Sequence, residues 1–357
     1  MSVFKTIDIK SRINNYSVVF VDDFTEKIAD DLRKNNFFII DKHIAEYYQK
    51  QLQPVLKHER YFIVEALEQN KTLDFARTVI KKLILSNCRK DNKLVAIGGG
   101  IIQDITGFIA SILYRGIGWI FYPTTLLAQC DSCIGSKTSI NLDEFKNQLG
   151  TFYPPIRIVI DVNFLQTLSL DEIKSGIGEI FHYYFISAHE QLKNLSDHYD
   201  QIIRSPELLQ VHINTSLEIK KQVIEKDEFD KNERNVFNYG HTFGHAIEAV
   251  SGFSVTHGQA VTMGMDIANY ISLCLGYLNK DTFEYMHQIL TKNMPDFRLT
   301  KEDELEDYIK ALSKDKKNIG SNLTCILTHG PGFMQKIQIP IENKFREMIL
   351  SYFKLGI

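Results

Sequence analysis

The sequence lacks the features of a secreted, membrane-spanning or nucleic-acid-binding protein. Its 357 residues carry 41 Lys and Arg against 44 Asp and Glu, so no bulk positive field attracts nucleic acid or anionic membranes. No run approaches the roughly 18 apolar residues of a membrane span. The N-terminal stretch MSVFKTIDIK has no apolar core of signal-peptide length. These absences predict a soluble cytoplasmic protein with no nucleic acid or membrane as partner.

Cysteine is also scarce. The five cysteines are odd in number and lie mostly in apolar contexts, which favours buried thiols of a reducing compartment over a disulfide framework. Cys130 and Cys133 form a CxxC motif, but no second pair stands at zinc-site spacing. A structural role is therefore favoured over redox or metal chemistry at this pair.

Strand-like and helical patterns alternate in the first half of the chain. Apolar runs such as NFFIID, KLVAIGGG and IGWIFYPTT are typical of buried strands, and LDFARTVIKKLILSN has helical spacing. From about Leu168 onward, helical periodicity dominates. The pattern predicts a Rossmann-like parallel-sheet α/β domain over residues 1–165 and a mostly helical domain over residues 166–357.

Glycines end one of the predicted strands. The stretch AIGGGIIQDITGF places Gly98, Gly99 and Gly100 between a strand and a helix, where the backbone can approach a diphosphate and the helix N-terminus offers N–H donors. It is not the GxGxxG motif, and a plain tight turn would also use glycines. Asp41 follows another strand, where its carboxylate could hold a ribose hydroxyl or cap a helix.

Three histidines stand in one stretch, NYGHTFGHAIEAVSGFSVTHGQAVTMGM, which begins at Asn238. His241 and His245 share a helix face, and His257 follows after a short break. Two imidazoles and one carboxylate are a common ligand set for catalytic zinc. Glu179, between small and apolar residues on a helical segment, is the best third ligand, because an unpaired charge there would be costly. The alternative is that these are ordinary core or surface histidines.

Several cationic side chains stand beside small residues. Most are expected on the solvated surface, but Lys137 lies in a Gly/Ser/Thr-rich loop directly after the nucleotide-binding pattern. Such a set over a cleft suits an anionic substrate. The set comprises Lys137, Lys146, Lys220, Lys221, Arg234, Lys316 and Lys317, with Asp131 and Asn147 nearby.

Taken together, these stretches resemble the dehydroquinate synthase family of NAD- and metal-dependent sugar phosphate cyclases. The resemblance extends in order from about Asp41 to Gly332. Its most specific segments are PTTLLAQCDSCIGSKTSIN and NYGHTFGHAIE. Supporting segments include GGGIIQD, KNQLGTFYPP, THGQAVTMGM and KDKKNIG.

The resemblance implies a role for each matching residue. Zinc or cobalt would be held by Glu179, His241 and His257. NAD would be bound by Asp41, Glu68, Lys71, Gly99, Gly100, Asp104, Thr124, Thr125, Asp131, Lys137 and Lys146. The phosphorylated substrate would be bound by Asn147, His182, Lys220, Arg234, Asn238, His245, Lys316 and Lys317, and by Arg115 of a neighbouring subunit in a homodimer. Asp131, Lys137, Lys220, Arg234, Asn238 and His245 would act directly in catalysis.

The implied reaction converts 3-deoxy-arabino-heptulosonate 7-phosphate to 3-dehydroquinate and phosphate. It proceeds by transient oxidation with NAD, phosphate elimination, re-reduction, ring opening and an intramolecular aldol step. NAD ends unchanged, and the protein mainly positions the substrate and stabilises charge.

Four residues depart from the family pattern. His182 replaces a lysine expected near the substrate hydroxyls, so one fixed positive charge is absent when the imidazole is neutral. Ser136 replaces a glycine of the usual GGKT, and Ser175 and Gly178 alter the small-residue pattern beside Glu179. The retained Lys220, Arg234 and Asn238 favour the carboxylated substrate. The alternative is a cyclase that forms a cyclitol from sedoheptulose 7-phosphate or glucose 6-phosphate.

Two functions from other classes of protein also remain as alternatives. A metal-dependent polyol dehydrogenase would share the fold and the glycine turn, but it would release NADH. A non-catalytic sugar-phosphate-binding relative would have no need of the intact set Glu179, His241 and His257.

Overall fold

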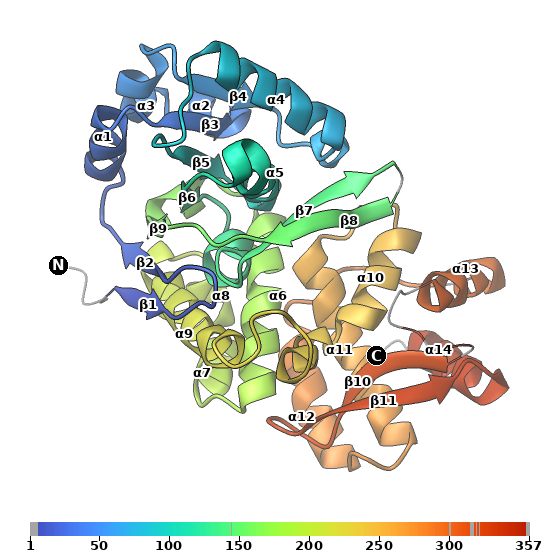
Figure 1. The fold of residues 1–357 in the computed structure, drawn as a ribbon. Coiled ribbons are helices and arrows are strands. Elements are labelled where there is room, and N and C mark those ends of the chain that lie inside the picture. Colours follow the sequence, from blue (N-terminus) through green and yellow to red (C-terminus); the bar gives the residue numbers. More distant parts are fainter. Residues whose placement is uncertain are drawn as a thin grey trace. The chain divides into compact units, whose positions relative to one another are not determined.

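The computed structural model describes residues 6–143, 145–299, 301–314, 318, 320 and 322–354 (Figure 1). The chain divides into two compact units. The first comprises Met1–Ser169 and Pro206–Phe229, and the second comprises Leu170–Ser205 and Asp230–Ile357. In the described part of the chain, no helix combines the length and apolar character needed to span a membrane.

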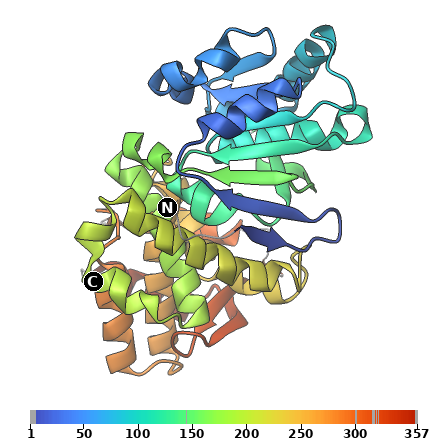
Figure 2. The same ribbon diagram turned by 90° about the vertical axis from the view of Figure 1, so that its left-hand side faces the viewer.

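A seven-stranded sheet forms the centre of the first unit. Its strand order is β1-β2-β9-β6-β5-β3-β4, and every pairing is parallel except that of β1 with β2. Figure 2 shows these strands lying side by side with helices next to them. The expected Rossmann-like parallel sheet is confirmed. The strands are β1 (Ile7–Ile9), β2 (Tyr16–Phe20), β3 (Phe37–Asp41), β4 (Tyr61–Val64), β5 (Leu94–Gly98), β6 (Trp119–Pro123) and β9 (Arg157–Ile160).

Alternating side chains of these strands pack under helices on the two faces of the sheet. On one face, Phe38, Val95 and Tyr122 join a buried cluster with residues of α1 and α3. On the other face lies α5, where Ile105 and Ile109 are fully buried. The helices of this unit are α1 (Thr25–Arg33), α2 (Lys42–Tyr47), α3 (Gln49–Leu56), η1 (Glu68–Asn70), α4 (Leu73–Leu85), α5 (Gly100–Ile112), η2 (Leu113–Arg115), η3 (Ala128–Ser132), η4 (Val162–Thr167) and α9 (Pro206–Ile224).

The segment Pro206–Phe229 clusters with the sheet, although the sequence-based division placed it in the helical half. Two buried polar contacts hold it there. Lys220 Nζ pairs with Asp131 Oδ1 at 2.7 Å, and Ser136 Oγ donates to Glu228 Oε1 at 2.8 Å. The periodicity of α9 correctly predicts a helix, but it does not indicate which unit the apolar face covers.

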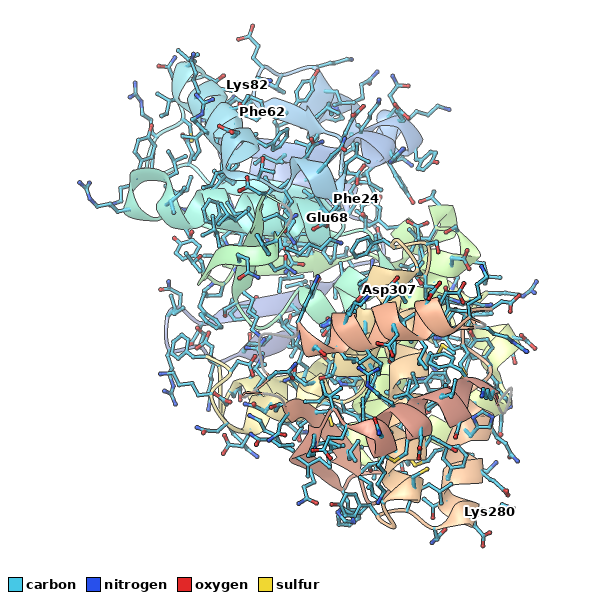
Figure 3. The ribbon with its side chains drawn as sticks, turned by 90° about the vertical axis from the view of Figure 1, so that its right-hand side faces the viewer. Phe24, Phe62, Glu68, Lys82, Lys280 and Asp307 are labelled. Carbon is cyan, nitrogen blue, oxygen red and sulfur yellow. The ribbon has the colours of Figure 1, made fainter. Side chains whose placement is uncertain are left out.

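A hairpin of β7 (Lys137–Leu142) and β8 (Phe145–Phe152) also belongs to the first unit. It packs against α5, where a side chain on Gly107 would meet Thr138 at 2.8 Å. Figure 3 labels Glu68, whose carboxylate accepts a hydrogen bond from Asn141 Nδ2 of this hairpin at 2.8 Å. Sequence patterns did not predict these two strands.

The second unit is mostly helical, as expected. Helix α11 is buried along most of its length, and it packs against α6, α10, α12 and α14. The helices are α6 (Leu170–Ser187), α7 (Gln191–Asp197), α8 (Tyr199–Ile202), η5 (Glu233–Asn238), α10 (His241–Val250), α11 (His257–Cys274), α12 (Lys280–Leu290), α13 (Glu302–Ser313) and α14 (Asn343–Lys354). Figure 3 labels Lys280 on α12 and Asp307 on α13.

An antiparallel pair, β10 (Asn322–Thr328) and β11 (Met334–Pro340), accompanies these helices. β10 is buried over most of its length, whereas most of β11 is exposed or half-buried. The sequence analysis did not predict this pair.

Candidate metal centre and cofactor-binding turn

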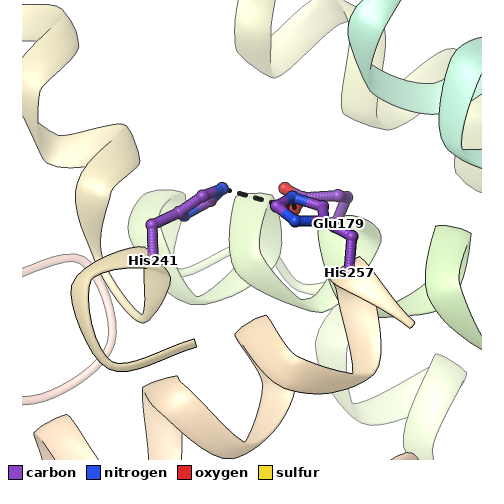
Figure 4. Close-up of side chains that lie close together, drawn as sticks. All are labelled: Glu179, His241 and His257. Carbon is purple, nitrogen blue, oxygen red and sulfur yellow. Dashed lines mark ion pairs between the residues drawn. The ribbon is translucent and has the colours of Figure 1, made fainter. Parts of the chain in front are cut away.

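Three helices of the second unit bring Glu179, His241 and His257 together (Figure 4). Glu179 lies in the middle of α6, and its side chain is only 2% exposed. His241 and His257 are the first residues of α10 and α11. Each histidine thus stands at a helix start, from which its ring reaches the same carboxylate.

The distances from the carboxylate oxygen to the two imidazole nitrogens fit a tetrahedral cation site. Glu179 Oε1 lies 3.4 Å from His241 Nε2 and 3.2 Å from His257 Nε2. Bonds of about 2.0–2.1 Å at tetrahedral angles place ligand atoms roughly 3.3–3.4 Å apart. Among the described residues, none donates a well-directed hydrogen bond to Glu179 Oε1, although this atom is buried. A divalent cation would satisfy that oxygen.

The other ring nitrogen of each histidine has a partner of its own. His241 Nδ1 lies 3.2 Å from the carbonyl oxygen of Tyr239, and His257 Nδ1 lies 3.3 Å from Glu248 Oε2. Since both partners are acceptors, the proton of a neutral ring belongs on Nδ1. The lone pair of Nε2 then faces the common centre, as a metal ligand requires.

Small residues allow the three helices to approach closely. A Cβ added to Gly258 of α11 would come within 1.7 Å of the backbone oxygen of Ser175 on α6. One added to Gly178 would come within 2.0 Å of the Gly258 oxygen. Ser175 Oγ also accepts a hydrogen bond from the Gly258 N–H at 3.0 Å. Two of the noted departures from the family pattern, Ser175 and Gly178, therefore form the α6–α11 contact.

The cluster shifts the pKa values of its members in opposite directions. Burial raises the pKa of Glu179, but the charges and close approach of the surrounding imidazoles outweigh it and hold the pKa well below its usual value. Burial lowers the pKa of His257, yet the neighbouring carboxylates of Glu179 and Glu248 raise it well above normal. A cation binding here takes the place of a proton, because a ligating imidazole must be neutral at the bonded nitrogen.

Two further histidines border this centre. His245 is exposed one turn after His241, and its ring centroid lies 5.5 Å from that of His241. His182 is fully buried one turn after Glu179, with Nδ1 3.5 Å from Glu179 Oε2. Both rings pack against His241, with ring centroids 4.9 Å away for His182 and 5.5 Å away for His245.

The remaining predicted substrate residues of this unit lie just before α10 or outside the described residues. Arg234 is buried in η5, and Asn238 ends that segment, with Nδ2 donating to the Asn235 carbonyl at 3.0 Å. Lys316 and Lys317 lie outside the described residues.

In the first unit, the glycine turn joins β5 to α5 as the sequence predicted. Gly99 is the N-cap of α5, and Gly100 is its first residue. A Cβ on Gly100 would meet no atom within 4 Å, whereas one on Gly99 would touch Thr125 at 3.0 Å. The turn thus leaves open space beside the N-terminus of a 13-residue helix, which suits a diphosphate.

A partly buried polar network lies next to this turn. Lys71 Nζ pairs with Asp104 Oδ2 at 2.7 Å and donates to Asn147 Oδ1 at 2.5 Å. Burial raises the pKa of Asp104 to about 6, although the charge of Lys71 acts to lower it. Lys71 therefore contacts two other residues that the resemblance assigned to cofactor and substrate.

A second, partly buried ion pair joins Asp131 and Lys220. Lys220 Nζ also donates to the Asp131 carbonyl at 2.7 Å. Asp131 lies in η3, a π-helical turn, a feature often found at functional sites. The flanking Cys130 and Cys133 are buried, and burial raises the pKa of Cys133 to about 12. This shift disfavours the thiolate and supports the structural reading of the CxxC pair.

The other predicted residues of this unit are placed as follows. Asp41 Oδ1 accepts from the His43 N–H at 2.8 Å and caps α2, as one of the two readings expected. Thr124 is buried, and the Thr125 hydroxyl accepts from the Ala128 N–H. Lys137, Lys146 and Arg115 are exposed.

Sequence patterns missed the partners that orient the site. Glu248, the Tyr239 carbonyl and the Lys71–Asp104 pair were not predicted. Glu248 stands nine residues before His257, and only the packing of α10 on α11 brings the two together.

Comparisons with known proteins agree with this architecture. The family models described as 3-dehydroquinate synthase N-terminal and C-terminal match residues 61–175 and 176–318. A 3-dehydroquinate synthase of Thermoanaerobacter sp. (strain X514) is 35% identical over 354 residues, covering 95% of this chain and 98% of the relative.

Two solved structures share the fold. One is a 2-deoxy-scyllo-inosose synthase complexed with carbaglucose-6-phosphate, NAD+ and Co2+ (TM-score 0.85, 24% identity, 97% and 99% of the two chains covered). The other is a 2-epi-5-epi-valiolone synthase from Streptomyces hygroscopicus subsp. jinggangensis 5008 with NAD+ and Zn2+ bound (TM-score 0.83, 21% identity, 96% and 97% covered). From its sequence relatives, the chain belongs to the 3-dehydroquinate synthase family.

Proposed function

We propose that this chain converts 3-deoxy-arabino-heptulosonate 7-phosphate to 3-dehydroquinate and phosphate, using NAD and one zinc or cobalt ion. The observation that carries the proposal is the convergence of Glu179 Oε1, His241 Nε2 and His257 Nε2 in a member of this family. The cytoplasmic location stays a prediction.

In this proposal, the metal ligands bind the cation and the glycine turn binds NAD. When bound, the cation would acidify a substrate hydroxyl and NAD would accept and later return a hydride. Glu179, His241 and His257 would hold the cation, and the Nδ1 partners of the two histidines fix the tautomer that leaves Nε2 as the ligand atom. Gly99 and Gly100 bind the diphosphate of NAD at the start of α5, with Asp41, Glu68, Lys71 and Asp104 on the ribose and adenine side.

Several polar side chains are proposed to bind the anionic ends of the substrate. Asn147 Oδ1 accepts from Lys71 Nζ and from Ser139 Oγ, which leaves the amide NH2 group as the donor to phosphate. His245, Asn238 and the Lys316/Lys317 pair would also bind phosphate. Lys220 and Arg234 bind the substrate carboxylate, and Asp131 and Lys137 contact cofactor and substrate.

Arg115 serves a neighbouring subunit's site in a homodimer. Tyr114 and Arg115 both have positive φ, 52° and 63°, a costly conformation for non-glycine residues that persists mainly at functional sites. The Arg115 side chain is exposed. Mixing inactive Arg115→Ala with inactive His257→Ala should restore activity, up to about a quarter of the parent's for random pairing. No restoration would overturn the shared site.

One assay tests the reaction itself. The chain, supplied with NAD and zinc, is given 3-deoxy-arabino-heptulosonate 7-phosphate, sedoheptulose 7-phosphate or glucose 6-phosphate, and phosphate release and product mass are measured. Phosphate and 3-dehydroquinate from the first substrate alone, without net NADH, are expected. Net NADH from a simple polyol would instead support a dehydrogenase.

His182 favours one second candidate, a cyclase acting on an uncarboxylated sugar phosphate. The buried imidazole stands where the family resemblance leads us to expect a lysine. If the carboxylated substrate is native, His182→Lys should raise activity on it. A loss, together with a cyclitol product from sedoheptulose 7-phosphate, would favour the second candidate.

A further inference from the structure

Glu248 lies beside the metal centre without being one of its ligands. It stands two turns after His241 on the same face of α10, and its side chain is 17% exposed. Its Oε2 atom lies 3.3 Å from Nδ1 of His257, on the side of the ring opposite the cation site. Glu248 therefore joins the end of α10 to the start of α11.

The two histidine ligands are oriented by chemically different partners. Nδ1 of His241 faces a neutral backbone carbonyl, that of Tyr239, at 3.2 Å. Nδ1 of His257 faces a carboxylate, which is a stronger acceptor and adds electron density to the imidazole. His257 has the more exposed side chain of the two, 30% against 17%, so packing alone restrains its ring less.

Glu248 could also be read as a ligand to a second cation, because His245, Glu248 and His257 lie close enough to share one. That reading conflicts with the position of His257. A neutral imidazole has one lone pair, and Nε2 of His257 already faces Glu179 Oε1 at 3.2 Å. Glu248 fits better as the acceptor of the Nδ1 proton.

We propose that Glu248 is a positioning residue for the metal ligand His257. Its carboxylate accepts the Nδ1–H hydrogen bond, fixes the ring orientation and directs Nε2 toward the cation. This inference rests on the proposed metal-dependent function. It assigns to Glu248 a task that is separate from substrate binding, so its removal affects the cation even when no substrate is present.

The test measures cobalt and zinc affinity of the full chain without substrate, by competition with a chromophoric chelator, together with the visible spectrum of bound cobalt. Glu248→Ala should weaken affinity by about 10- to 100-fold and change the cobalt spectrum. Glu248→Gln keeps an acceptor without the charge, and Glu248→Asp keeps the charge at shorter reach. Both should fall between Glu248→Ala and the parent. Glu284→Gln on α12, an exposed position, is the matched control.

Parent-like affinity and spectrum in Glu248→Ala, or in Glu248→Gln if the alanine variant does not fold, would overturn the proposal. A parent chain that binds no cation, or a His257→Ala variant that keeps the parent's affinity, would overturn the proposed function as well. Failure confined to the Glu248 variants leaves the proposed function standing.

Discussion

The glycine turn of the first unit and the histidine cluster of the second prepare binding sites in opposite ways. At the turn, glycine has no side chain, and the backbone at the start of α5 therefore faces open space beside Gly100. At the cluster, Gly178 and Gly258 have no side chains that would hold the helices apart, so the ligands can meet. Glycine thus serves ligand access in one unit and helix packing in the other.

The largest effect is expected from removing a ligand of the cluster. His257→Ala should lower bound zinc and reduce turnover to below about 1% of the parent's, because the cation both binds and activates the substrate hydroxyl. Metal analysis and phosphate release check this. His329→Ala, an exposed histidine of the same unit, is the control. Full metal content and turnover in His257→Ala would refute the ligand assignment.

The packing role of glycine is tested next. Gly258→Ala places a Cβ 1.7 Å from the Ser175 backbone oxygen, so α6 and α11 must separate. We expect a loss of about 1–3 kcal/mol in the free energy of unfolding, with weaker metal binding. Thermal unfolding and chelator competition measure the two. A parent-like variant would show that the helices need not approach so closely.

Substitution of the glycine that leaves space for the ligand should have the opposite effect, with stability kept and ligand affinity reduced. Gly100→Ala meets no atom within 4 Å, so stability should hold or rise slightly. NAD affinity should fall by about tenfold or ~1.4 kcal/mol, since the methyl group occupies space beside the helix N-terminus. Calorimetry with NAD and thermal unfolding separate the effects. Unchanged NAD affinity would place the diphosphate elsewhere.

The smallest effect concerns a histidine–carboxylate pair away from the cluster. His287 Nδ1 lies 2.9 Å from the buried Asp266, which also accepts from Tyr352. Burial lowers the pKa of His287, but the hydrogen bond and charge of Asp266 raise it above normal overall. The pair therefore stabilises fully below about pH 6.5 and loses this contribution as pH rises through the folded pKa.

His287→Gln should remove that part of the pH dependence. The difference in unfolding temperature between parent and variant should shrink from about pH 5.5 to about pH 8.5. If the difference in unfolding temperature stays constant across this pH range, protonation of His287 does not contribute to stability.

Much of this architecture followed from sequence patterns because it depends on local periodicity. Buried runs such as Phe37–Asp41 and Leu94–Gly98 predicted the parallel sheet, and the spacing of His241 and His245 predicted their shared helix face. Glu179 was found because a buried charge needs a partner.

What the patterns missed depends on which surfaces meet. The apolar stripe of α9 predicts a helix, but not that it packs in the first unit. Glu248 resembles any polar residue near a helix end, and only tertiary packing places it on His257. The strand β10 is buried over most of its length, and periodicity alone does not separate such a buried run from a buried helical segment.

The most direct test is a crystal structure of the zinc- or cobalt-loaded chain, with anomalous scattering recorded at the absorption edge of the metal. We expect a single strong peak about 2.0–2.2 Å from Glu179 Oε1, His241 Nε2 and His257 Nε2. A peak at other residues, or none at this cluster in a chain that still releases phosphate from its substrate, would contradict the metal centre described above.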